Sequence, residues 1–127
     1  MRWKIHLDLT HGYIVAEQWD EFSMNEQFAF LRAIMTSDYW SPGKPLMIKY
    51  TGLKIVKMES NDLEKISDDL GKLIGQIRAS RIALVAGNEL QFGLGRAFQM
   101  ISESRVKGDI EVFRDETAAL KWLVEKI

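Results

Sequence analysis

The sequence predicts an α/β fold in which four helices cover a mixed five-stranded sheet. The central observation is the segment 81–86, in which residues 82–86 are all apolar. This run is too short for a helix and does not alternate, which is typical of a strand buried on both faces. A second observation is the alternation of apolar and polar residues over 3–10, which indicates a strand with one buried face. Helical and strand patterns then alternate to the end of the chain, which favours parallel strands joined by right-handed crossovers.

Composition favours a single soluble domain over residues 1–127, because 46% of the residues are hydrophobic and 28% are charged. The 17 basic and 18 acidic residues give a net charge of -1, so no overall field favours nucleic acid or an anionic membrane. The absence of cysteine excludes disulfides and thiolate chemistry. The start of the chain does not resemble a secretory signal, and no apolar stretch approaches the roughly 20 residues of a membrane span. We therefore expect a cytoplasmic protein.

The first two strands are predicted to form an antiparallel hairpin. His11 and Gly12 separate two strand patterns, and glycine adopts the positive φ of a tight turn at no steric cost. The return strand is expected over 13–19. With a two-residue turn, the register pairs Leu9 with Ile14, Leu7 with Ala16, and His6 with Glu17.

The middle of the chain contains two predicted helices around one predicted strand. The spacing Ser-x-x-Glu from Ser23 is that of a capping box, so a helix should follow it. Residues 39–45 contain both prolines of the chain and predict a loop. A strand is expected over 46–50, followed by a turn at residues 51–52. The next helix should begin at Ser60, which suits an N-cap, and extend to Ile77.

The last two helices are predicted from caps and apolar stripes. Asn88 is expected to cap a helix and Asp115 to cap the final one, with a short strand over 110–113 between them. In the helix after Asn88, one stripe should face the core and comprises Leu90, Leu94, Ala97, Phe98 and Ile101. The opposite, polar stripe comprises Arg96, Gln99 and Glu103, with Phe92 on the same side.

Four segments of the chain resemble the bacterial SpoIIAA-like family. They are Arg-Ile-Ala-Leu-Val-Ala at 81–86, Leu-Gly-Arg-Ala-Phe at 94–98, Ile-Glu-Val-Phe-Arg-Asp at 110–115 and Ala-Ala-Leu-Lys-Trp-Leu at 118–123. Before residue 81 the resemblance is mainly in the order of elements and in the Tyr-Thr-Gly-Leu segment at 50–53. The resemblance implies a single STAS-type domain and a regulatory or protein-interaction function without catalysis.

Anti-sigma factor antagonists of the STAS class carry an Asp-Ser-Ser-Gly-like phosphoacceptor motif before the helix that follows the Thr-Gly segment. The corresponding residues here are Lys-Met-Glu-Ser at 57–60, so the motif does not match. Ser60 is the sole candidate phosphoacceptor, and the plain N-cap role is favoured for it. Glu59 as a permanent phosphate mimic is less favoured, because a carboxylate has less charge and fewer acceptor oxygens than a phosphate.

A candidate ligand site lies where two predicted parallel strands end. Thr51 and Gly52 follow one strand and Asn88 and Glu89 follow another, and ligands of open α/β sheets bind at such ends. A small, partly apolar ligand would fit there. Capping alone also explains Asn88, and turn geometry also explains Gly52, so the structural interpretation is favoured.

A candidate partner surface is formed by aromatic residues that periodicity does not bury, namely Phe92, Tyr39 and Trp40. Arg96 and Gln99, one and two turns from Phe92, could rim such a patch and hold a protein partner or a second copy. Burial of the same aromatics under neighbouring loops is the alternative, and both remain open.

The sequence predicts no catalytic residue, metal or cofactor. The only histidines, His6 and His11, are not spaced as a helical metal pair. Gly93 and Gly95 match the first two glycines of a dinucleotide-binding fingerprint, but Phe98 stands where the third glycine should be and the pair lies inside a predicted helix, which excludes that motif. The sequence also contains no P-loop. The preferred function is therefore a non-enzymatic regulatory or interaction module, with a small-ligand carrier or sensor as the alternative.

Overall fold

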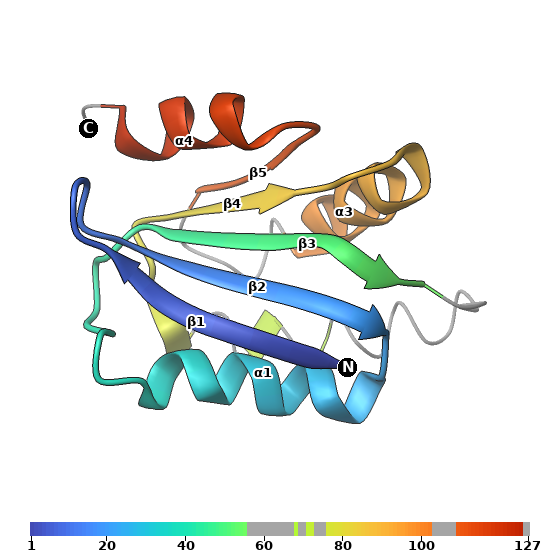
Figure 1. Cartoon of the computed structure of the whole chain (residues 1–127), viewed down its shortest axis with the longest axis horizontal. Helices are drawn as coiled ribbons and strands as arrows, with labels where there is room; N and C mark the ends of the chain where they lie inside the picture. The colour runs from blue at the N-terminus through green and yellow to red at the C-terminus, as the bar shows by residue number, and fades with distance from the viewer. Residues whose placement is uncertain (56–67, 69–70, 73–75, 103–108, 126–127) are drawn as a thin grey trace.

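The computed structural model describes residues 1–55, 68, 71–72, 76–102 and 109–125 (Figure 1). The strands are β1 (Arg2–Asp8), β2 (Tyr13–Glu21), β3 (Leu46–Lys54), β4 (Arg81–Val85) and β5 (Asp109–Phe113). The helices are α1 (Met24–Thr36), α3 (Glu89–Ser102) and α4 (Glu116–Val124). Within the described residues there are thus three complete helices rather than the four predicted. The predicted helix from Ser60 to Ile77, with its cap and its phosphoacceptor candidate, lies largely outside them.

The five strands form one mixed sheet in the order β1-β2-β3-β4-β5. β1 and β2 are antiparallel, and each later neighbouring pair is parallel, which confirms the predicted α/β architecture. Figure 1 shows α1 and α4 on opposite sides of this sheet. On one face, buried residues of α1 and partly buried aromatics of α3 pack on the same core cluster. On the other face, Ala119 and Leu123 of α4 pack against β2, β3 and β4. β4 is buried on both faces, as its sequence predicts.

The β1–β2 turn is longer than predicted. β1 ends at Asp8 and pairs Leu7 with Ile14, so four residues, 9–12, form the turn instead of two. Asp8 explains the difference, because its carbonyl accepts a hydrogen bond from Gly12 N at 2.8 Å and its carboxylate accepts one from His11 N at 2.9 Å. Leu9 is therefore 89% exposed rather than paired. The register moves by two residues, which keeps the side chains that remain paired on their predicted faces.

β3 also differs from the prediction, because it continues through residues 51–52 to Lys54 instead of turning there. Its pairing with β2 steps from Glu17–Lys49 to Trp19–Gly52, so β3 carries one extra residue, a β-bulge. The bulge allows Tyr50 and Leu53, three residues apart, both to face the same core cluster. A Cβ atom on Gly52 would lie 3.0 Å from the Trp19 Cβ, which explains the glycine.

The predicted caps of α1 and α4 are confirmed. The Ser23 hydroxyl accepts a hydrogen bond from Glu26 N at 3.4 Å, and the Asp115 carboxylate accepts one from Ala118 N at 2.8 Å. Each cap satisfies a backbone N–H that has no partner inside the helix. These caps fix the points at which the chain leaves β2 and β5.

Candidate functional site

Helix α3 faces the sheet with two glutamines as well as with the aromatic side chains of Phe98, as predicted, and Phe92, whereas a purely apolar stripe was predicted. Gln91 and Gln99 are only 2% and 6% exposed, and the buried Gly95 lies between them. Leu90 and Met100 are instead 66% and 68% exposed. The predicted buried position of Leu90 and the predicted exposed position of Gln99 are therefore both wrong. The physical reason is that both glutamines bind main-chain atoms of the sheet.

Gln91 occupies the place of a missing strand. β4 pairs with β3 only as far as the Lys49–Val85 pair, so β4 does not pair with the rest of β3. The Gln91 Nε2 atom donates hydrogen bonds to the carbonyl oxygens of Thr51 at 3.2 Å and Leu53 at 2.9 Å. Its Oε1 atom accepts a hydrogen bond from Gly87 N at 2.6 Å. One buried amide thus satisfies three main-chain groups that would otherwise lack partners.

Gln99 performs the same task at the free edge of β5. Its Nε2 atom donates a hydrogen bond to the Ile110 carbonyl at 2.8 Å, and its Oε1 atom accepts one from the Arg96 guanidinium at 3.1 Å. The Phe113 carbonyl accepts from Ala86 N, so it points toward β4. Because successive carbonyls alternate in direction, the Ile110 carbonyl points to the opposite side, the outer edge. Gln99 therefore covers an edge position that another chain could otherwise pair with.

Gly95 and Tyr50 hold the middle of α3 close to the sheet. A Cβ atom on Gly95 would collide with the Tyr50 hydroxyl and would lie 3.0 Å from the Val112 Cγ1. The Tyr50 hydroxyl donates a hydrogen bond to the Gln91 carbonyl at 2.9 Å. Burial raises the pKa of Tyr50 well above its ordinary value, so the hydroxyl keeps its proton and remains a donor.

The opposite side of α3 presents an apolar surface, which we call the outer face and define as Leu90, Gly93, Ala97 and Met100. Helical spacing places these four residues on one stripe. Gly93 is exposed, and no described atom would lie within 4 Å of a Cβ added to it. Exposed apolar stripes of this kind are typical of surfaces that contact another molecule.

The four predicted ligand residues are exposed, but the side chains of Asn88 and Glu89 and the carbonyl of Thr51 have partners. The Asn88 side chain accepts a hydrogen bond from Gln91 N at 2.8 Å, which is the predicted capping role. Gln91 connects this cap to the Thr51 carbonyl. Gly52 packs on Trp19 within β3. The structure thus brings Thr51 and Asn88 together around the Gln91 amide.

Glu89, the fourth of these residues, pairs with Arg114 at the start of α4. The Arg114 Nε atom lies 3.0 Å from the Glu89 Oε1, and a second nitrogen lies 3.4 Å from Oε2. The hydrogen bond to Arg114 lowers the pKa of the Glu89 carboxyl below its ordinary value. The guanidinium carbon also lies 3.7 Å from the centre of the Phe92 ring, so it covers that ring.

The five predicted partner residues do not form one surface. Phe92 is half-buried beneath Arg114, and Gln99 is buried. Arg96 is exposed beside the outer face. Tyr39 is exposed and Trp40 packs partly on the core, but both lie in the loop before β3. Figure 1 shows this loop at the left end of the sheet and α3 at the right end.

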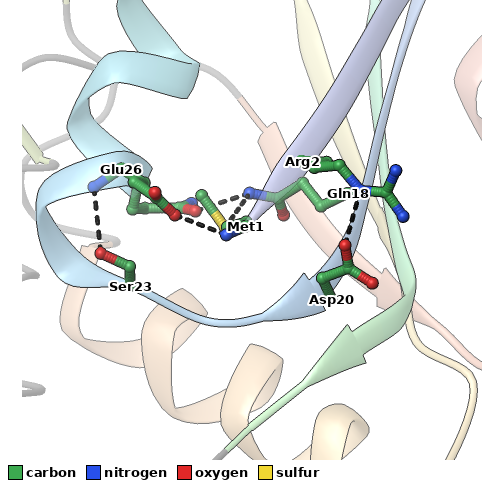
Figure 2. Close-up of polar contacts among 7 residues, drawn as sticks. Met1, Arg2, Gln18, Asp20, Ser23 and Glu26 are labelled. Atoms are coloured by element: carbon green, nitrogen blue, oxygen red, sulfur yellow. Dashed lines mark hydrogen bonds and ion pairs between the residues drawn. The ribbon is translucent and has the colours of Figure 1, made fainter.

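A polar cluster at the end of β2 was not predicted. Figure 2 shows Gln18 among residues of β1 and α1. The buried Gln18 amide donates a hydrogen bond to the Gln27 Oε1 at 2.6 Å, and the amino group of Met1 lies 2.6 Å from the Glu26 carboxylate. Arg2 pairs with Asp20 at 2.6 Å, and Asp20 has a φ of +69°. These contacts fasten β1 and β2 to the start of α1, which is a structural role.

His6 and His11 lie on β1 and in the turn that follows it. In the part of the chain that the structure describes, no three acidic, histidine or cysteine side chains are grouped so that they could hold a metal ion. None of the described helices combines the length and the apolar character that a membrane span needs.

Comparison with known proteins supports the fold. No family model and no curated protein matches the chain. Among solved structures, an uncharacterized DUF3478-family protein of Shewanella loihica PV-4 with a SpoIIAA-like fold matches with a TM-score of 0.59 and 20% identity. The match covers 96% of this chain and 92% of that one. The chain therefore has the SpoIIAA-like fold, as the resemblance in its sequence implies.

Proposed function

We propose that the protein is a non-enzymatic interaction module of the SpoIIAA-like type, which binds a protein partner through the outer face of α3. The observation that carries the proposal is the exposure of Leu90 and Met100, each about two-thirds accessible, on a helix whose inner side carries two buried glutamines. Burying a leucine or methionine side chain against a partner yields about 1.5–3 kcal/mol. Two such anchors, ten residues apart on one stripe, provide a basis for binding.

The inner contacts of α3 support this proposal because they fix the orientation of the helix. Rotating α3 to bury Leu90 would withdraw Gln91 and Gln99 from the carbonyls of β3 and β5. Each buried carbonyl left without a donor costs about 1–3 kcal/mol, so rotation would cost more than burying one leucine gains. The apolar outer face is thus a stable property of the folded chain.

The alternative, a small-ligand site at the strand ends, has less support. The side chain of Asn88 caps α3, and the carboxylate of Glu89 pairs with Arg114. The Thr51 carbonyl and Gly87 N–H are bonded to the Gln91 side chain. A ligand would have to displace these bonds, whereas a protein partner on the outer face displaces none of them.

Site-specific photo-crosslinking tests the proposal. A photo-crosslinking amino acid replaces Leu90 or Met100 in the protein inside its producing cells, and covalent adducts are identified by mass spectrometry. The control replaces Leu9, which is more exposed but lies in the β1–β2 turn. We expect discrete protein adducts from positions 90 and 100 and none from position 9. Equal adduct formation at all three positions, or none at any, would contradict the proposal.

A further inference from the structure

We draw no further inference here: the strongest candidate, the exposed apolar outer face of α3 between Leu90 and Met100, belongs to the interaction site already proposed, and nothing in the part of the chain that the structure describes shows which molecule covers it.

Discussion

Replacing Gln91 by leucine should destabilise the protein, although leucine is apolar and the position is buried. Gln91→Leu removes the donor to the Thr51 and Leu53 carbonyls and the acceptor for Gly87 N. Each buried main-chain group left unpaired costs about 1–3 kcal/mol, and burial of the new side chain offsets part of the sum. We expect a net loss of about 2–4 kcal/mol in the free energy of unfolding. This is a large fraction of the roughly 5–15 kcal/mol typical of a domain.

Urea unfolding followed by circular dichroism measures this loss. With a slope of about 1–3 kcal/mol per molar urea, the midpoint should fall by about 1 M or more. The matched control is Gln76→Leu, because Gln76 is a helical but exposed glutamine and its replacement should have little effect. An unchanged or higher midpoint for Gln91→Leu would refute the reasoning that hydrogen bonds, rather than apolar packing, orient α3.

Three further predictions concern the same region. Gly95→Ala should lower the free energy of unfolding by about 1–3 kcal/mol, because the new Cβ atom collides with the Tyr50 hydroxyl. Adding Tyr50→Phe should restore part of this loss. If the losses of the two single variants simply add in the double variant, the collision is contradicted. Gln99→Leu should expose the Ile110 carbonyl at the edge of β5 and increase concentration-dependent aggregation, measured by light scattering, whereas Arg96→Gln, which leaves that carbonyl bonded, should not. The Glu89–Arg114 pair should contribute stability above the unfolded-state pKa of a glutamate, about 4.3, and lose it as pH falls through the lowered pKa of Glu89. Arg114→Gln should therefore destabilise the protein more at pH 7 than at pH 3 in urea unfolding, and an equal effect at both would show that the pair contributes nothing.

The sequence predicted the architecture because burial leaves a clear pattern in the strands. The apolar run at 82–86 belongs to a strand covered on both faces, and the alternation before Asp8 belongs to one covered on a single face. Register was harder to predict. The carboxylate of Asp8 lengthens the first turn, and the bulge in β3 depends on pairing with Trp19 across the sheet. Both effects depend on partners that periodicity does not reveal.

The candidate site was predicted only in part. The cap at Asn88 follows from local spacing and was correct. The orientation of α3 was not predicted, because hydropathy assigns leucine to the core and glutamine to the surface. The glutamines are buried since β4 is shorter than β3 and β5 has a free edge. The spacing of Gln91, Gly95 and Gln99, one helical turn apart, was a signal for this orientation.

Because β3 is longer than β4, the chain needs a glutamine at position 91 to bind the end of β3. β3 has nine residues and β4 has five, and the gap is filled by an amide from a helix. If β4 were extended by two or three residues, its own backbone would pair with the end of β3, and a glutamine at position 91 would lose its acceptors. α3 would then have fewer hydrogen bonds that oppose turning its leucines inward. In this chain, the short β4 leaves carbonyls that Gln91 must bind, and this contact keeps the apolar outer face of α3 exposed to solvent.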